Sequence, residues 1–368
     1  MIKREIFVLM IFIVLYSAQY VNSENIDTNA LTSTSVTMCD PSNSNLIINS
    51  PGTYTLINNV LINASSSCFN INASNVVLDC QGFEIRGKGS GTGVRVLVPS
   101  ISQPRSNIVV RNCIINNFSF GISFSGIFNS PITNSVIDNN LIMNIQHFYP
   151  SLPISIGLSL VNNLNVTRNR ITKFIGDTTF HSGSAIEVCY ADRLIMDSNV
   201  ISDSMDGGFE FGQMNNSIIN NNTVMNTEGP FGGILFYDRG SPLFCGSDMF
   251  NITVSNNNAI NNSRGFDSVG SVKKNFLVIN NNAIGNNLTG TGFNLLSIPN
   301  VTYINNTATN HGTGFVFGTN TTAINNTAIN NTIGFNMDNL GLFSGNKAYL
   351  SSTGFLVDDD TNILEDNI

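Results

Sequence analysis

Charged residues are scarce in this chain of 368 residues. Asp, Glu, Lys and Arg make up only 11% of it, and the formal net charge is −8 at pH 7. A protein that binds nucleic acid needs a basic face to neutralise phosphates. Because this sequence has no basic face, we expect no nucleic-acid partner.

Histidine is also rare. The three histidines, His147, His181 and His311, are far apart, and no cluster of Met or of Cys and His has the spacing of metal ligands. Copper and other soft metals need such clusters. The residues themselves therefore predict no copper site.

Long apolar runs are confined to the N-terminus. Lys3 and Arg4 precede an apolar run from Ile6 to Leu15, which is short for a membrane span and typical of a secretory signal peptide. We expect residues 1–23 to be this signal, with an uncleaved N-terminal anchor as the alternative. No transmembrane segment is expected after it. The mature protein is therefore predicted to be secreted or held at the cell surface.

Cysteine occurs six times, which in an exported protein favours disulfide bonds. Six cysteines allow fifteen pairings, so the connectivity is not predicted. Four of them lie near the N-terminal end and two lie apart. The six are Cys39, Cys68, Cys80, Cys113, Cys189 and Cys245.

A short phrase repeats between Asn251 and Phe355: an apolar run, an Asn pair, another apolar residue, a polar turn and a Gly-Phe pair. The Gly-Phe pairs recur at intervals of 27, 22, 20 and 20 residues. A period of this length is typical of a solenoid. The pairs are Gly265-Phe266, Gly292-Phe293, Gly314-Phe315, Gly334-Phe335 and Gly354-Phe355.

The residues on either side of each Asn pair alternate between apolar and polar, which is the pattern of short strands. A unit of two or three such strands cannot bury its own apolar face, so each coil must lie on the next with its strands in parallel. This predicts an all-β, right-handed parallel β-helix. Asn suits the corners because it tolerates left-handed backbone and can stack in ladders.

Two marks extend the repeat toward the N-terminus and predict about eleven coils. We expect a polar leader at 24–45 and one β-helix domain at 46–368, whose first part, 46–92, is the cap. The earlier Gly-apolar marks are Gly93-Val94, Gly121-Ile122, Gly157-Leu158, Ala185-Ile186, Gly208-Phe209 and Gly233-Ile234. The Asn-x-apolar mark falls at Asn112, Asn140, Asn169, Asn199, Asn222, Asn258, Asn282, Asn306 and Asn326.

The segment CFNINASNVVLDCQGFEIRG, followed by SNIVVRNCIINNFSFGI and serial Asn-Asn coils, resembles the exported right-handed β-helix proteins of archaea and bacteria. These include the periplasmic copper-binding β-helix family and the wider carbohydrate-binding and sugar-hydrolase β-helices. The resemblance covers residues 47–368 and lies in the coil-forming positions. It therefore implies the fold and leaves the function open.

Alternate residues after each Gly mark are predicted to face the core and the solvent. The predicted inward set is Val94/Val96, Ile122/Phe124, Leu158/Leu160, Ile186/Val188, Phe209/Phe211, Ile234/Phe236, Phe266, Phe293/Leu295, Phe315/Phe317, Phe335/Met337 and Phe355/Val357. The predicted outward column is Arg95, Ser123, Ser159, Glu187, Glu210, Leu235, Asp267, Asn294, Val316, Asn336 and Leu356.

Glu187 and Glu210 are predicted to be neighbours in this outward column. Two adjacent carboxylates repel each other unless they share a proton, bind a cation or flank a substrate. A solvated acidic face, a calcium or glycan site, and a catalytic pair all fit the sequence, with Arg239 as the candidate base of a lyase. Residues in nearby turns that would join a ligand site are Asp177, His181, Asp203, Asp206, Tyr237 and Asp238.

Three functions are consistent with these residues. The first is an exported, non-catalytic β-helix that contacts glycans or a cell-envelope component through its solvent face. The second is a polysaccharide lyase or glycoside hydrolase that uses Glu187 and Glu210, although the chain lacks the Gly-His-Gly and Asn-Thr-Asp motifs of polygalacturonase-type β-helices. The third is a metal-handling accessory protein. No cofactor other than calcium is expected.

Overall fold

The computed structural model shows a protein made of strands, and Ser33–Ile368 forms one compact unit. In the part of the chain that is described, no helix is long and apolar enough to cross a membrane. The predicted signal peptide at 1–23 lies outside that part. The described ranges are 33–36, 46–62, 67–146, 153–174, 183–205, 207–229, 232–237, 248–270, 273–286, 288–337, 340–357 and 361–368.

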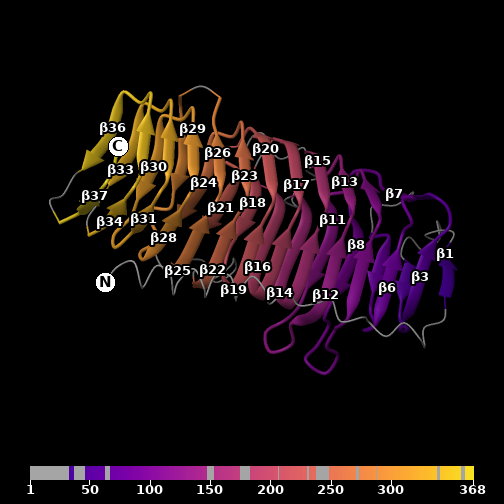
Figure 1. Ribbon diagram of the computed structural model, residues 1–368. Coiled ribbons are helices and arrows are strands. Elements are labelled where there is room, and N and C mark those ends of the chain that lie inside the picture. The colour runs from indigo at the N-terminus through magenta and orange to yellow at the C-terminus, as the bar shows by residue number, and fades with distance from the viewer. Residues whose placement is uncertain are drawn as a thin grey trace. The chain divides into compact units, whose positions relative to one another are not determined.

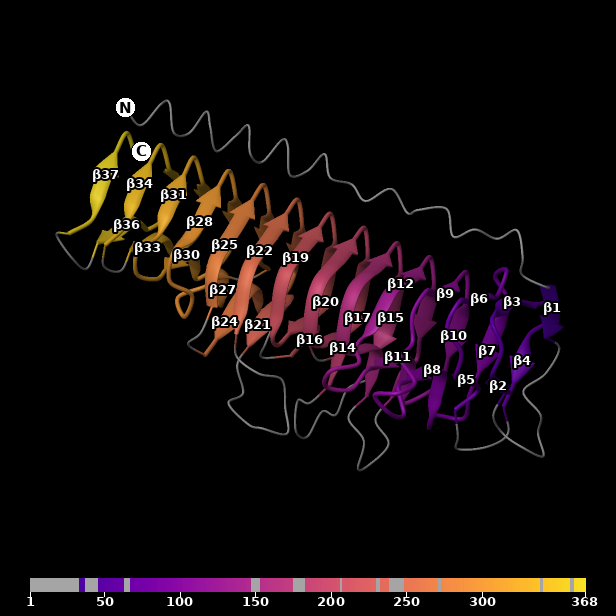
Figure 2. The same ribbon diagram turned by 90° about the horizontal axis from the view of Figure 1, so that it is seen from below.

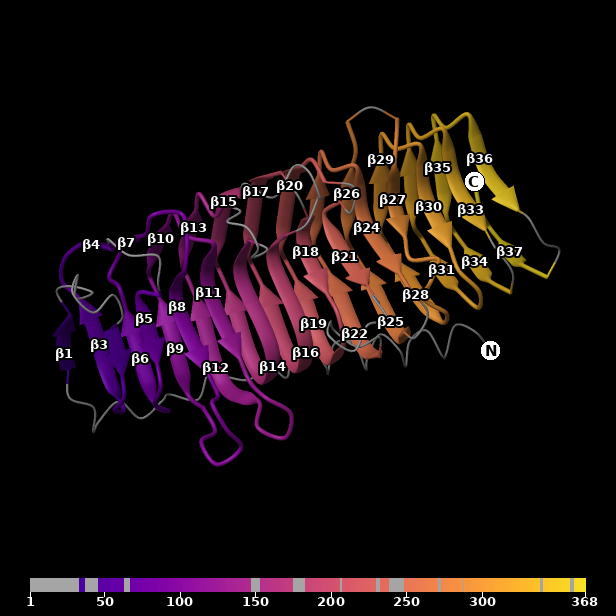
Figure 3. The ribbon, with the colours of Figure 1, turned by 180° about the vertical axis from the view of Figure 1, so that it is seen from behind.

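Strands of successive turns pair in parallel and form a 25-stranded and a 12-stranded sheet. The larger sheet bends so that it forms two sides of the solenoid, which we call face 1 and face 2. The long strands β14 and β16 pass from one of these sides to the other (Figure 1). The smaller sheet is face 3. The views from below and from behind show the strands of each face side by side along the unit (Figures 2 and 3). The predicted all-β parallel β-helix is confirmed, and its handedness and coil number stay predictions.

Face 1 carries the Gly-apolar mark. It consists of β2 (Leu46–Ile48), β5 (Phe69–Ile71), β8 (Thr92–Leu97), β11 (Phe120–Ser125), the first parts of β14 (Ile154–Thr167) and β16 (Ser184–Asp197), β18 (Gly207–Phe211), β21 (Ile234–Tyr237), β24 (Arg264–Val269), β27 (Thr291–Asn294), β30 (Thr313–Phe317), β33 (Ile333–Met337) and β36 (Thr353–Val357).

Face 2 follows face 1 in each coil. It consists of β1 (Ser33–Val36), β3 (Gly52–Leu56), β6 (Val76–Asp79), β9 (Ile108–Arg111), β12 (Ile132–Asp138), the second parts of β14 and β16, β19 (Met214–Asn220), β22 (Met249–Ser255), β25 (Lys273–Ile279), β28 (Val301–Ile304), β31 (Thr322–Ile324), β34 (Leu342–Ser344) and β37 (Ile363–Glu365). Strand β1 pairs with β3 and lies inside the segment 24–45, for which the sequence predicts a polar leader.

Face 3 closes the coil. It consists of β4 (Val60–Leu61), β7 (Glu84–Arg86), β10 (Ile114–Asn116), β13 (Leu141–Met143), β15 (Arg170–Phe174), β17 (Val200–Ser204), β20 (Thr223–Thr227), β23 (Asn258–Ile260), β26 (Asn282–Ile284), β29 (Thr307–Thr309), β32 (Thr327–Ile329) and β35 (Lys347–Tyr349).

The core is a set of stacked side chains from the three faces. On face 1, the rings of Phe266, Phe293, Phe315, Phe335 and Phe355 stack in one line, with successive centroids 4.7, 4.8, 4.9 and 5.0 Å apart. The first four are fully buried and Phe355 is partly buried, so the predicted ladder is confirmed. Glycine precedes each Phe because the next coil lies too close for a side chain. A Cβ at position 314 would lie 2.6 Å from the Gly334 carbonyl oxygen.

The predicted register is wrong by two residues in one coil. The structure pairs Gly157, and not Ser159, with Glu187 in the outward column, because Ile156 takes the place of the first inward residue. Leu160, predicted to be inward, is instead a partly exposed corner residue with a φ of 53°. Val357 is also predicted to be inward, but in the last coil it is 40% exposed.

The Asn-Asn pairs have two separate roles. The first Asn of a pair, such as Asn221 or Asn305, takes the left-handed conformation at the corner between faces 2 and 3. Asn tolerates this conformation better than most residues. The second Asn is buried, and its amide nitrogen donates to the side-chain oxygen of the next coil's Asn. This inner Asn ladder runs through Asn140, Asn169, Asn199, Asn222, Asn257, Asn281, Asn306, Asn326, Asn346 and Asn367.

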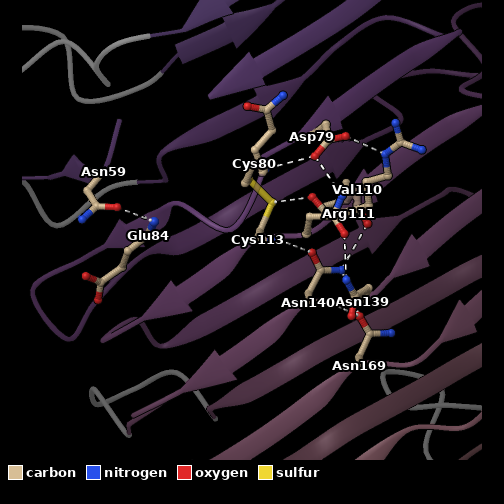
Figure 4. The surroundings of a disulfide bond; sticks show 12 residues. Asn59, Asp79, Cys80, Glu84, Val110, Arg111, Cys113, Asn139, Asn140 and Asn169 are labelled. Atoms are coloured by element: carbon tan, nitrogen blue, oxygen red, sulfur yellow. Dashed lines mark hydrogen bonds and ion pairs between the residues drawn. A yellow bond between two sulfur atoms is a disulfide. The ribbon is translucent and has the colours of Figure 1, made fainter. Parts of the chain in front are cut away.

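A disulfide takes the place of the inner Asn ladder near the N-terminal end. Cys80 is bonded to Cys113, and the main-chain N–H of Cys113 donates to the side-chain oxygen of Asn140 at 3.0 Å (Figure 4). The bond therefore joins two successive coils at the position that Asn occupies afterwards. Cys68 and Cys189 are disulfide-bonded as well, which confirms the expected oxidation of these cysteines.

Candidate functional site

Acidic residues gather in the outward column of face 1 at the middle of the stack. The register pairs Glu187 with Glu210, Glu210 with Leu235, and Leu235 with Asp267. Because neighbouring strands lie about 4.8 Å apart, the two glutamates are adjacent, as the alternation predicts. We call Glu187, Glu210, Leu235 and Asp267 the acidic column.

Three members of the acidic column are buried although they lie at outward positions. The exposed fraction is 5% for Glu210, 2% for Leu235 and 1% for Asp267. Outward residues of later coils, such as Asn294 and Val316, are half-buried. A buried carboxylate destabilises the fold unless it is paired or hydrogen-bonded. A plain solvated acidic face, one of the three expectations for this column, therefore does not describe Glu210 or Asp267.

Tyr237, in β21, links its coil to the coil of Glu187, in β16. Its hydroxyl lies 3.4 Å from Oε1 of Glu187, two coils earlier, and donates a hydrogen bond to it. The coil between them has Gly212 after Phe211, so no side chain at that position blocks the ring. Tyr237 is 5% exposed and packs with Leu235 against the disulfide-bonded Cys189. The phenol is thus held against the outer face by apolar contacts and joined to an acid.

Asp267 is held by several donors. Its carboxylate forms an ion pair with Arg264 and accepts hydrogen bonds from the side chain of Asn294 at 2.8 Å and the main-chain N–H of Ser268 at 2.9 Å. Charge-assisted bonds of this kind offset the free energy lost by burying the carboxylate. Asp267 therefore fixes the shape of this face. The sequence pattern places it in the column but assigns it no role, because Arg264 precedes the repeat mark.

The carboxylate of Glu210 uses space that a glycine leaves. A Cβ built at Gly207 would lie 2.8 Å from Oε1 of Glu210. Gly207 begins β18, where other coils have a side chain such as Ser184. In the sequence, the Gly-Gly pair before Phe209 is the feature that provides this space. Its spacing alone predicts only the position of the repeat, and not room for a carboxylate.

Most of the other predicted site residues lie outside the described part of the chain. These are Asp177, His181, Asp206, Asp238 and Arg239. Their segments lead into or out of β16, β18 and β21, so their roles stay predictions. Asp203 lies near the end of β17 on face 3, where its carboxylate accepts a hydrogen bond from Asn226 at 3.0 Å.

Within the described residues, no three His, Cys, Asp or Glu side chains gather as they would around a metal ion. His311, the histidine that the structure describes, is fully buried in the core, and neither ring nitrogen has a hydrogen-bond partner. Burial lowers the pKa of His311 to about 4. The calcium site expected at Glu187 and Glu210 has no third acidic, His or Cys side chain beside it among the described residues, and it stays a prediction.

Two hollows lie away from the acidic column, at corners of face 3. One, of about 530 Å³, is bordered by Gln81, Gly82, Asn112, Asn139 and Leu141 beside the Cys80–Cys113 disulfide. The other, of about 440 Å³, is bordered by Arg86, Asn116, Asn117, Asn144 and Gln146. Both are open toward solvent. Neither contains a pair of acids, so neither matches the predicted catalytic site.

No family model matches the sequence, and no curated protein matches it. Solved structures are similar in fold. The catalytic unit of a GH87 alpha-1,3-glucanase from Streptomyces thermodiastaticus has a TM-score of 0.57 at 12% identity, and the match covers 93% of this chain and 64% of that one. The periplasmic alginate epimerase AlgG has a TM-score of 0.53 at 13% identity, covering 86% of this chain and 78% of that one.

The tailspike protein of E. coli bacteriophage HK620, solved with a pentasaccharide, has a TM-score of 0.53 at 13% identity. The match covers 85% of this chain and 60% of the tailspike, so this chain spans less than two thirds of that protein and of the glucanase unit. At such low identity the likeness shows the fold alone. The chain is a parallel β-helix protein, and its resemblance to the periplasmic copper-binding family has no support from a family match.

Proposed function

We propose that this protein is exported and binds neutral glycans on the outer face of β16, β18, β21 and β24 without cleaving them. The observation that supports this most is the acidic column, with Tyr237 joined to Glu187. Among the carboxylates of this column, that of Glu187 is exposed enough to accept hydrogen bonds from sugar hydroxyls, and Tyr237 holds it in place. The same carboxylates would repel a uronate polymer, so the ligand is expected to be uncharged.

Binding fits the geometry better than catalysis. A catalytic acid must reach the reacting atoms, but Glu210 is 5% exposed and Asp267 is 1% exposed. Asp267 is already bonded to Arg264 and Asn294. These two acids therefore shape the face, while Glu187, which is half-buried, is exposed enough to contact a ligand. The glucanase and the epimerase are named for reactions on polysaccharides, and the tailspike was solved with a pentasaccharide, which agrees with a glycan ligand here.

A polysaccharide lyase or glycoside hydrolase is the second candidate. Glu187 and Glu210 are direct neighbours in parallel strands. Their expected separation of about 5 Å is the one that retaining glycosidases use. The Tyr237 phenol, already bonded to Glu187, would be placed to pass a proton. Arg239, the predicted lyase base, lies outside the described residues.

Calorimetric titration with two sets of oligosaccharides tests the proposal. One set is α-1,3-linked gluco-oligosaccharides, which are neutral, and the other is mannuronan oligosaccharides, which are acidic. We expect the neutral set to bind and Glu187→Gln to weaken that binding at least tenfold. Asn336→Gln, at the equivalent outward position of a later coil, should leave it unchanged. Failure of both sets to bind would overturn the proposal.

Two further readouts separate the other functions. Release of new reducing ends, or of unsaturated sugar products, would replace the binding proposal with the enzymatic one. The predicted calcium site at Glu187 and Glu210 requires that millimolar calcium raise the melting temperature. A ligand at a hundredfold excess over its Kd stabilises the fold by about 2.7 kcal/mol. An unchanged melting temperature would remove calcium from the proposal.

A further inference from the structure

An aromatic pair stands at the corner beside the acidic column. Phe128 is 66% exposed, and its ring meets the ring of Tyr190 edge to face, with centroids 5.3 Å apart. Tyr190 belongs to β16, the strand that carries Glu187. A large exposed aromatic side chain such as that of Phe128 loses the stabilisation of burial, and its partner Tyr190 is half-buried.

The position of Phe128 is fixed by main-chain bonds. Ile127 and Ser130 donate main-chain hydrogen bonds to each other, at 3.2 and 2.9 Å, and between them Phe128 and Asn129 form a tight turn. Asn129 has a φ of 65°, which suits the third residue of a type II turn. The main-chain N–H of Gly126 donates to the carbonyl oxygen of Ser159 in β14 at 2.8 Å. These bonds fix the main chain at Phe128, and the contact with Tyr190 positions its ring.

Tyr190 is held in an unfavourable backbone conformation. Its φ is 58°, in the left-handed region where most corners of this protein have Asn. For a bulky residue this conformation costs about 1–2 kcal/mol. The neighbouring coil has Leu160 in the same conformation. The corner therefore presents a ring where the fold alone would favour Asn or Gly.

Glu187 and Tyr190 are three residues apart in β16, and Tyr190 lies at the corner where this strand turns from face 1 to face 2. Their Cα atoms are therefore at most about 10 Å apart, the length of a straight strand of this size. Cys189 stands between them and packs against Leu235 and Tyr237. A ligand that spans this distance would have more than one sugar ring.

We propose that Phe128 and Tyr190 form a stacking platform for a pyranose ring, as a second subsite beside Glu187. The C–H-rich face of a neutral sugar ring is apolar and fits an aromatic ring, whereas its hydroxyl edge fits the carboxylate of Glu187, which Tyr237 holds in place. This inference rests on the proposed function and deepens it. It predicts that oligosaccharides of two or more rings bind better than single sugars.

Titration of the α-1,3-linked gluco-oligosaccharides into variants of the full chain tests the platform. We expect Phe128→Ala and Phe128→Leu each to weaken trisaccharide binding at least tenfold, because Leu restores apolar bulk but no ring. Their effect on glucose binding should be below twofold. Tyr349→Ala, which removes another exposed aromatic residue far along the stack, is the matched control and should change nothing.

The outcomes separate the two proposals. If wild type binds and Glu187→Gln weakens binding, but Phe128→Ala does not, the platform is wrong and the glycan site stands. If wild type binds no oligosaccharide, both are wrong. A loss of stability in Phe128→Ala would leave the titration ambiguous, so NMR of wild-type protein with ring-labelled Phe provides the second test. A trisaccharide must then give contacts between its C–H protons and the ring of Phe128, and their absence would overturn the platform.

Discussion

Two groups of coils have the same kind of interior but different exteriors. The earlier coils contain β16, β18, β21 and β24, and the later coils contain β27, β30, β33 and β36. The inner Asn ladder runs through both regions without a break. On the outside, the earlier coils have the acidic column with its buried carboxylates, and the later coils have Asn294, Val316, Asn336 and Leu356. Residues that build the coil and residues that could bind a ligand therefore occupy opposite faces of the same strands.

The largest effect is expected in the shared interior. Phe315→Ala removes the middle ring of the Phe stack, which contacts Phe293 and Phe335 at 4.8 and 4.9 Å. A buried Phe replaced by Ala costs about 3–5 kcal/mol because a cavity remains. Urea unfolding should show this loss, and glycan binding by the distant acidic column should survive in the folded fraction. A variant that melts within a degree of wild type would show that the coils are not held together by this stack.

The next effect depends on pH and on His311. Its folded-state pKa of about 4 lies below the ordinary value of 6.5. Above pH 6.5 the His311 imidazole is neutral in both the folded and the unfolded state, so it makes no pH-dependent contribution to stability. As the pH falls toward 4, this imidazole binds a proton in the unfolded chain but stays neutral in the folded one. The free energy of unfolding should therefore decrease by about 3 kcal/mol over this range.

His311→Asn is the matched control for the pH effect, because Asn331 occupies the same corner in the next coil and accepts the main-chain N–H of residue 311. The variant should lose the His311 contribution to the decrease between pH 6.5 and 4. Unfolding titrations at a series of pH values measure both proteins. Parallel curves for the two would contradict a neutral, buried imidazole.

A smaller effect distinguishes the two members of an Asn pair. The side-chain oxygen of Asn306 accepts the main-chain N–H of Asn281 at 2.9 Å, so Asn306→Ala leaves a buried donor without a partner. We expect a loss of about 2 kcal/mol. Asn305 is an exposed left-handed corner residue with a φ of 54°, and Gly tolerates that conformation, so Asn305→Gly should cost only a few tenths of a kcal/mol. Equal losses would mean that the pair has no such division of roles.

The interior could be predicted from the sequence because it repeats. The Gly-Phe intervals predict that Phe266, Phe293 and Phe315 stack on one another, and the Asn pairs predict the corners. The error at Gly157 arises where the repeat weakens, since Ser155-Ile156 carries the mark there in place of Gly. The inner and outer roles of the Asn pair could not be predicted, because periodicity alone does not tell which of two identical neighbours is buried.

The candidate site could be predicted only in part, because it does not repeat. Alternation makes Glu187 and Glu210 neighbours, as the structure shows. The bond from Tyr237 to Glu187 passes over Gly212 in the coil between them, and no local pattern indicates a contact across two coils. The edge-to-face contact between Phe128 and Tyr190 joins residues from two coils through a turn outside the repeat. Contacts of this kind depend on distances between coils and not on the order of residues within one.

Only a small effect on stability is expected when the acid pair is copied onto the later coils. Val316 and Asn336 are neighbours in the outward column, as Glu187 and Glu210 are, and both are half-buried. Like charges directly opposite each other in a sheet destabilise it, so Val316→Glu combined with Asn336→Glu should cost below about 1 kcal/mol, and less at high salt. The later coils have no counterpart of Tyr237 joined to the acids or of the Phe128–Tyr190 pair among their described residues. In a background where Glu187→Gln has removed the original site, the copied pair should therefore restore no binding of gluco-oligosaccharides. Restored binding would mean that two adjacent acids suffice, and that the aromatic residues around the acidic column contribute nothing to recognition.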